Sequence, residues 1–136
     1  MNVFIVGAGP GDPELITVKG QKLLSEADVI IYAGSLVNPA LLDYAKAGCE
    51  IHNSASMTLP QVINVIEDSV KQGKMVVRLH TGDPSIYGAI QEQMDALDKL
   101  GIEYKVVPGV SSFLATAAAL KQEYTLPGIS QTVIIT

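Results

Sequence analysis

Hydrophobic residues gather along the chain in short runs, which are separated by longer stretches with a helical repeat. The runs are rich in β-branched residues and do not alternate between apolar and polar positions. Strands that are apolar on both faces are typical of a parallel sheet covered on both sides by helices. We therefore predict strands at Val3–Val6, Val29–Tyr32, Glu50–His52, Met75–Leu79, Tyr104–Val107 and Thr132–Ile135.

Residues that begin and end helices stand between these runs. Thr17 can cap a helix that extends to Ala27, and Thr58 with Gln61 forms a capping box ahead of a helix that ends before Gly73. The alternation of strands and helices indicates an α/β fold, with a mostly parallel sheet and helices on both faces. Further helices are predicted for residues 87–100, for the alanine-rich residues 112–120, which can pack close to the sheet, and in shorter form after Asn38-Pro39.

The order of these elements divides the chain into three parts. Residues 1–121 form an N-terminal α/β domain, and residues 122–131 are a linker that contains proline and glycine. The apolar run that follows stops at Thr136. Domains seldom end on an apolar strand with nothing to cover it, so we interpret residues 132–136 as the first strand of a second α/β domain. We accordingly expect this chain alone to be inactive and to bind its ligand weakly.

Composition and charge argue against several classes of protein. The net charge is −5 and Arg78 is the only arginine, so we expect no nucleic-acid surface, which needs clustered basic side chains. The sequence shows no secretory signal and no apolar run near the ~20 residues that span a membrane, so we expect a cytoplasmic protein without a membrane partner. Cys49 and His52 point to opposite faces of a predicted strand, and no metal site is expected.

The first predicted strand ends in a glycine-rich loop, Gly7–Pro13. Its glycines follow G-x-G-x-G, whereas a dinucleotide-binding loop follows G-x-G-x-x-G. Pro10 removes a backbone donor, and Asp12 places a negative charge where a pyrophosphate would lie. No acidic residue follows Tyr32 to hold a ribose. These departures argue against NAD or FAD, and Asp12 can simply cap a turn at Pro13.

Two further loops, His80–Ser85 and Pro108–Ser112, follow later strands. Asp83 can cap a helix that begins after it, and one of the two serines that open the next helix can cap it while the other faces a cleft. Each loop alone is typical of a structural turn. Because the carboxyl ends of parallel strands share one edge of a sheet, the three loops together indicate a binding cleft there. His80 has no visible partner and is interpreted as a packing or solvated residue.

The three loops, taken in order, resemble the tetrapyrrole (corrin/porphyrin) methylase family. The matching segments are residues 6–20, 77–88 and 108–112, and their order and separation match along the whole chain. Within the family, the segment Tyr32–Val37 (YAGSLV) resembles the subgroup that methylates C11 of precorrin-4. Members of the family are longer than this chain, which agrees with the abrupt end at Thr136.

The resemblance implies a two-domain enzyme, usually a homodimer, that binds S-adenosylmethionine between its domains. The aspartate that matches Asp12 is assigned as a proton acceptor in uroporphyrinogen-methylating relatives, so Asp12 is a candidate catalytic residue here. The basic residue assigned as proton donor in those relatives is replaced by Gly34, so the acid–base pair is incomplete. By motif position, contacts with the methyl donor fall on Pro10, Thr81, Gly82, Asp83, Ile86, Tyr87, Ser111 and Ser112.

The implied reaction is S-adenosylmethionine-dependent methyl transfer to C11 of precorrin-4 or cobalt-precorrin-4, in the biosynthesis of cobalamin. Holding the sulfonium methyl group and the ring carbon in line can supply roughly 7–11 kcal/mol of the barrier, so positioning can replace strong acid–base groups. A polycarboxylate tetrapyrrole substrate needs positive charge nearby, which helix N-termini, Lys19 and Lys22 can provide.

Other functions remain open from the sequence. A member of the same family could methylate C20 or C17 of a corrinoid, methylate uroporphyrinogen, or make diphthine. The acidic net charge disfavours ribosomal RNA 2′-O-methylation, another activity of the family. A non-enzymatic α/β module that binds a nucleotide is the alternative outside the family.

Overall fold

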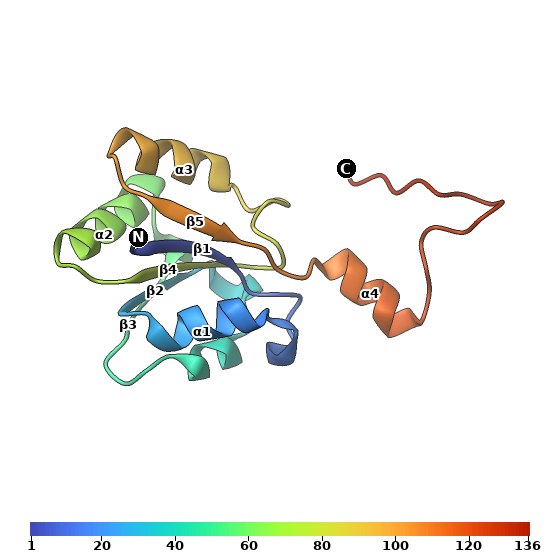
Figure 1. Ribbon diagram of the computed structural model, residues 1–136, viewed down its shortest axis with the longest axis horizontal. Helices are drawn as coiled ribbons and strands as arrows, with labels where there is room; N and C mark the ends of the chain where they lie inside the picture. The colour runs from blue at the N-terminus through green and yellow to red at the C-terminus, as the bar shows by residue number, and fades with distance from the viewer.

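The computed structural model describes residues 1–136, and five strands in it form one sheet in the order β3-β2-β4-β1-β5. Every neighbouring pair of strands is parallel, which confirms the predicted α/β fold (Figure 1). The strands are β1 (Val3–Gly7), β2 (Val29–Tyr32), β3 (Glu50–Asn53), β4 (Val76–His80) and β5 (Tyr104–Val107). The helices are α1 (Val18–Glu26), α2 (Leu59–Lys71), α3 (Ile90–Lys99) and α4 (Ser112–Leu120).

Helices cover both faces of the sheet, as predicted (Figure 1). On one face, α1 and a 3-10 helix at Pro39–Tyr44 enclose a core that includes Leu24, Ile30 and Val77. On the other face, α2 and α3 enclose a second core that includes Val29 and Ile31. Because successive residues of a strand point to opposite faces, β2 and β4 supply apolar side chains to both cores. This double burial is why the strands read as continuous apolar runs.

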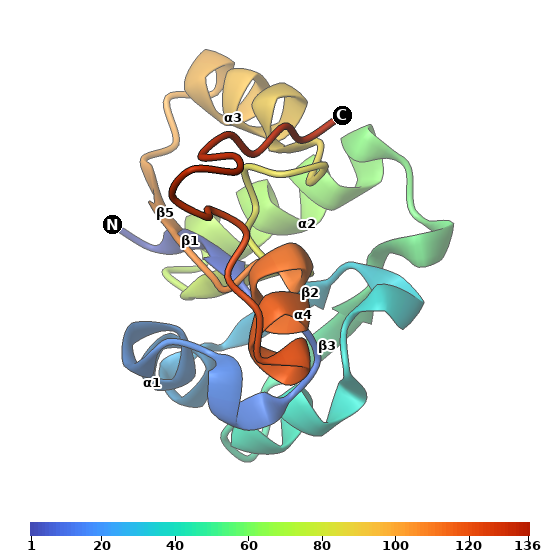
Figure 2. The ribbon, with the colours of Figure 1, turned by 90° about the vertical axis from the view of Figure 1, so that its right-hand side faces the viewer.

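The carboxyl ends of the strands lie along one edge of the sheet, and the chain leaves two neighbouring strands there toward opposite faces. β1 and β4 are neighbours, but the chain leaves β1 for α1 on one face and leaves β4 for α3 on the other. Open parallel sheets bind ligands at such a point, where the loops diverge. Figure 2 looks at this side of the molecule and shows α4 in front of the sheet.

The predicted helix starts at Thr17 and Thr58 are confirmed. The Thr17 hydroxyl accepts a hydrogen bond from the Gly20 amide at 3.0 Å. Thr58 and Gln61 form both hydrogen bonds of the capping box. Gly73, just past α2, has a φ of 72°, a left-handed conformation that glycine adopts without strain.

The predicted helix at residues 87–100 begins three residues later than expected, since α3 covers only Ile90–Lys99. Tyr87 and Ala89 have φ values of 56° and 50°, and a right-handed helix cannot contain them. The segment Pro84–Tyr87 therefore forms a separate turn ahead of the helix.

The expectation that residues 112–120 pack close to the sheet is wrong. α4 projects beyond the carboxyl edge (Figure 1), and Ala117 is its only buried residue. Both faces of the sheet are already covered by other elements, so no face remains for α4. Leu114 and Leu120 are consequently 53% and 63% exposed.

The predicted strand at Thr132–Ile135 is not formed in this structure, where these residues are exposed and unpaired. A strand requires backbone groups of a neighbouring strand, and none lies beside this segment. Its assignment to a second domain, and the division into residues 1–121, 122–131 and 132–136, stay predictions.

Candidate functional site

Four glycines, Gly7, Gly9, Gly82 and Gly109, bring the three predicted loops together at the carboxyl edge. Gly9 and Gly82 exchange backbone hydrogen bonds of 3.2 and 2.9 Å, which join the loops after β1 and β4. A Cβ atom on Gly7 would lie 2.6 Å from the Gly82 carbonyl oxygen and 2.7 Å from the Gly109 Cα. The crossing of the three loops therefore depends on the absence of a side chain at position 7.

Asp83 fastens the second loop to the third. One oxygen of its carboxylate, Oδ1, accepts a hydrogen bond from the Ser85 amide at 2.8 Å, and the other, Oδ2, accepts one from the Gly109 amide at 3.0 Å. The sequence indicated a helix cap at this residue. In the structure Asp83 caps a turn instead, because α3 begins only at Ile90.

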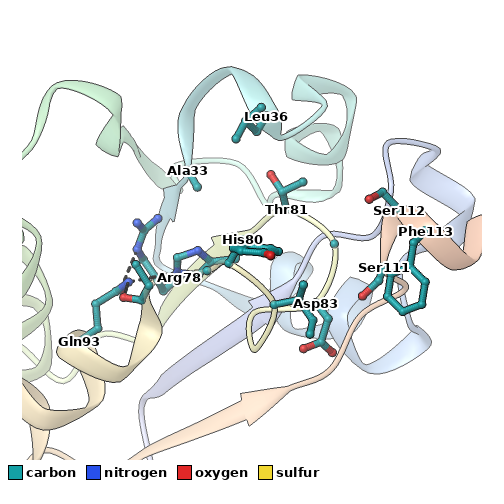
Figure 3. A pocket seen from close by; sticks show the side chains of 15 residues that line it. Ala33, Leu36, Arg78, His80, Thr81, Asp83, Gln93, Ser111, Ser112 and Phe113 are labelled. Atoms are coloured by element: carbon teal, nitrogen blue, oxygen red, sulfur yellow. Dashed lines mark hydrogen bonds between the residues drawn. The ribbon is translucent and has the colours of Figure 1, made fainter. Parts of the chain in front are cut away.

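A pocket of about 410 Å³ opens beside this crossing (Figure 3). Its volume lies in the usual range of small-molecule sites, about 300–1,000 Å³. The structure brings seven of the eight residues expected to contact the methyl donor into its wall: Thr81, Gly82, Asp83, Ile86, Tyr87, Ser111 and Ser112.

Pro10 and Asp12, the remaining residues predicted from the first loop, do not line the pocket. Asp12 is exposed, and its Oδ1 accepts a hydrogen bond from the Glu14 amide at 2.9 Å, so it caps a 3-10 turn at Pro13–Leu15. Its capping role, read from the sequence, is thereby confirmed.

The YAGSLV segment, Tyr32–Val37, supplies another part of the pocket wall. Ala33 and Leu36 line the pocket from the loop that follows β2. Gly34 is buried with a φ of 71°, and a Cβ atom there would lie 2.9 Å from the Ala55 Cβ. A basic side chain at position 34 would thus be strained, and the acid–base pair of uroporphyrinogen-methylating relatives has no counterpart in the geometry here.

The turn between Asp83 and α3 is strained where it borders the pocket. Tyr87 and Ala89 both line the pocket and both adopt the left-handed backbone conformation that non-glycine residues rarely take. Such strain concentrates at ligand sites, because only the surrounding structure can hold it.

A buried polar cluster that was not expected from the sequence lines one end of the pocket. Arg78 and His80, on β4, are 7% and 4% exposed, and Gln93 of α3 forms hydrogen bonds with both (Figure 3). The Arg78 Nε donates to Gln93 Oε1 at 3.1 Å, and the Gln93 Nε2 lies 3.3 Å from His80 Nε2. A charged residue inside an otherwise apolar strand run was the available signal, because arginine is almost never fully buried without a partner.

Burial determines the ionisation of this cluster. It lowers the pKa of Arg78 to about 10, so the guanidinium stays charged at neutral pH. Burial, followed by the nearby charge of Arg78, lowers the pKa of His80 to about 4, so the imidazole is neutral. Arg78 only donates, so Gln93 must present its oxygen to Arg78 and its amide nitrogen to His80, which accepts at Nε2.

Lys19 and Lys22, which were expected to supply positive charge, do not line the pocket, whereas Arg78 does. Lys19 is instead close to Lys105 of β5, which lowers the pKa of its ammonium group.

No three His, Cys, Asp or Glu side chains are grouped so that they could hold a metal ion. None of the helices combines the length and the apolar character needed to cross a membrane.

Comparison with known proteins gives consistent matches. A cobalt-precorrin-4 C(11)-methyltransferase of Methanocaldococcus jannaschii is 66% identical over 134 residues, which are 98% of this chain and 52% of that protein. The enzyme of the same name from Priestia megaterium is 52% identical over 100% of this chain and 53% of its own length. This chain therefore spans about half the length of these relatives.

Solved structures agree with the sequence matches. The X-ray structure of the cobalamin biosynthetic enzyme cobalt precorrin-4 methyltransferase, CbiF, superposes with a TM-score of 0.95 at 52% identity, over 97% of this chain and 55% of that one. A uroporphyrin-III C-methyltransferase of Thermus thermophilus, complexed with S-adenosylhomocysteine, gives 0.79 at 34% identity, over 97% and 53%. The family model described as Tetrapyrrole (Corrin/Porphyrin) Methylases matches residues 2–136. The chain belongs to the tetrapyrrole methylases.

Proposed function

We propose that the protein containing this chain transfers a methyl group from S-adenosylmethionine to C11 of precorrin-4 or cobalt-precorrin-4, in cobalamin biosynthesis. The observation that carries the proposal is 66% identity, over nearly the whole chain, to a relative named for this reaction. The YAGSLV segment resembles the same subgroup, and its residues Ala33 and Leu36 line the pocket. We extend the proposal to a cytoplasmic homodimer on the family resemblance.

The pocket wall fits S-adenosylmethionine. The Thr81 Oγ1 is buried and has no hydrogen-bond partner within the protein, so it is free to bond a polar group of a ligand. Gly82 and Ser112 line the same wall. When bound, the donor supplies an electrophilic methyl group on a sulfonium sulfur.

In this proposal the protein catalyses by positioning. The crossing of the three loops at Gly7, Gly82 and Gly109 fixes the wall that would hold the donor. The strained turn at Tyr87 and Ala89 fixes the adjoining wall. Orientation by such rigid elements can supply roughly 7–11 kcal/mol of the barrier to an in-line transfer.

Asp12 stays a candidate proton acceptor, although it is exposed and lies outside the pocket wall. If it accepts a proton after methyl transfer, Asp12→Asn should lower kcat and leave the affinity for S-adenosylhomocysteine unchanged. Turnover and calorimetry on the same variant measure the two effects. Unchanged turnover would remove Asp12 from the mechanism.

The geometry disfavours the alternative of a dinucleotide-binding module. In that fold the glycine-rich loop runs directly into a helix, whose N-terminus holds the pyrophosphate. Here β1 ends at Gly7 and α1 begins only at Val18, with a 3-10 turn between them. The first loop is also bonded to the second through Gly9 and Gly82.

Isothermal titration calorimetry separates these two functions. The protein expressed from its full gene should bind S-adenosylhomocysteine, the stable product of the donor, and should not bind NAD. Binding of NAD without binding of S-adenosylhomocysteine would refute the methyltransferase proposal.

A further inference from the structure

Arg78 is a buried charge for which the protein supplies no counter-ion. The four ion pairs of the structure join other residues, and Arg78 takes part in none of them. Its hydrogen-bond acceptors, the Gln93 amide oxygen at 3.1 Å and the Ile31 carbonyl oxygen at 3.2 Å, are both neutral. Removing a charge from water is costly unless an opposite charge compensates it. The uncompensated charge therefore calls for an anion from outside the chain.

The guanidinium leaves one of its ends free for that anion. Its Nε and Nη1 bond Gln93 and Ile31, whereas its Nη2 has no protein partner. Thr81 Oγ1 is the only fully enclosed side-chain nitrogen or oxygen without a hydrogen-bond partner, so the unpartnered Arg78 Nη2 is not fully enclosed. Because Arg78 lines the pocket, we infer that this nitrogen is the atom that faces it. A guanidinium edge presented in this way suits a carboxylate.

Arg78 lies away from two of the expected contacts of the methyl donor, Ser111 and Ser112. Figure 3 shows Arg78 and Gln93 at one end of the pocket, near Ala33, and Ser111 and Ser112 at the other. Asp83, the other charged residue of the pocket wall, has its carboxylate bonded to backbone amides. His80 is neutral and does not compensate Arg78. The end of the pocket at Arg78 is therefore positive and lies away from the serines.

We propose that Arg78, held in place by Gln93 and the Ile31 carbonyl, anchors a carboxylate of a bound ligand. The inference rests on the proposed function, in which the substrate is a polycarboxylate tetrapyrrole. We assign this carboxylate to the tetrapyrrole because Arg78 lies near Ala33, at the end of the pocket away from Ser111 and Ser112. The amino-acid carboxylate of the methyl donor is the other source with the same chemistry, and the experiment separates the two.

Gln93→Glu is the most discriminating variant, because it places a carboxylate beside Arg78 within the protein. An internal ion pair would then compete with the ligand, and the dissociation constant of cobalt-precorrin-4 should rise at least about 30-fold, as for loss of a buried charge partner. Arg78→Lys keeps the charge but loses the planar fork, and should weaken binding by a smaller factor. Gln21→Glu, which adds the same charge at an exposed position of α1, should bind as the wild type does.

Both ligands are titrated into each variant, after cooperative thermal unfolding has shown that the variant is folded. Weaker cobalt-precorrin-4 binding with unchanged S-adenosylhomocysteine binding assigns the anchor to the substrate. The reverse pattern keeps the anchor but assigns it to the methyl donor. If folded Gln93→Glu and Arg78→Lys both bind the two ligands with wild-type affinity, the proposal is overturned. A Gln93→Glu variant that is more stable than the wild type but binds both ligands equally well would show a purely structural role and would also overturn it. If the wild type binds neither ligand, the proposed function itself fails, and the anchor fails with it.

Discussion

Replacing Gly7 by alanine is expected to lower the free energy of unfolding by at least about 3 kcal/mol, at the upper end of overpacking effects, and to abolish binding of S-adenosylhomocysteine. The new Cβ would lie 2.6 Å from the Gly82 carbonyl oxygen and 2.7 Å from the Gly109 Cα, both backbone atoms. No rotation of a side chain relieves such an overlap, so the loops must separate. Separation displaces Gly82, which lines the pocket. Chemical denaturation and calorimetry measure the two losses.

Gly73→Ala is the matched control for this variant. Gly73 lies past the end of α2 with a φ of 72°, and no atom lies within 4 Å of an added Cβ. Alanine there bears only the left-handed backbone penalty of roughly 1–2 kcal/mol and leaves the pocket intact. If Gly7→Ala were as stable as Gly73→Ala and bound S-adenosylhomocysteine normally, the three-loop crossing would not organise the site.

Lowering the pH from 7 to 5 should cost about 2 kcal/mol of folding free energy through His80 alone. Its pKa falls from the ordinary 6.5 to about 4 in the folded protein, because it is buried and lies near Arg78. Between these two values the unfolded chain binds a proton that the folded chain does not. Stability from this group is therefore complete above pH 6.5 and declines as the pH falls toward 4.

Denaturant titrations of the wild type and His80→Gln, at several pH values, isolate this effect. Carboxylates titrate in the same range in both proteins, so the difference between the two curves reports His80. Parallel curves for the wild type and His80→Gln would show that His80 is not held neutral by its surroundings.

The fold was largely predictable from the sequence because the strands and helices depend on local patterns, namely apolar runs and helix-capping residues. The apolar runs at Val29–Tyr32 and Tyr104–Val107 coincide with β2 and β5, and Thr17 and Thr58 cap the helices as expected. The start of α3 was not predictable, because the left-handed backbone at Ala89 depends on tertiary contacts rather than on residue type. The position of α4 depends on which sheet faces remain uncovered, and this requires the whole topology.

The candidate site likewise has a part that local sequence patterns predict and a part that depends on tertiary packing. Glycines, Asp83 and the serines mark the loops in the sequence, and seven residues expected from the motifs do share one pocket. Arg78, His80 and Gln93 come from β4 and α3, and only the packing of α3 on the sheet brings them together. The local sequence of α3 gives no reason to pair Gln93 with Arg78, so this cluster could not be predicted from patterns alone.

The position of the transferred methyl group tests the central claim most directly. The protein expressed from its full gene is incubated with cobalt-precorrin-4 and S-adenosylmethionine whose methyl group is isotopically labelled, and the product is examined by NMR. The proposed function predicts a single labelled methyl group, bonded to C11. A labelled methyl group at C17, C20 or another ring position, or no transfer from a donor that calorimetry shows to be bound, would contradict it.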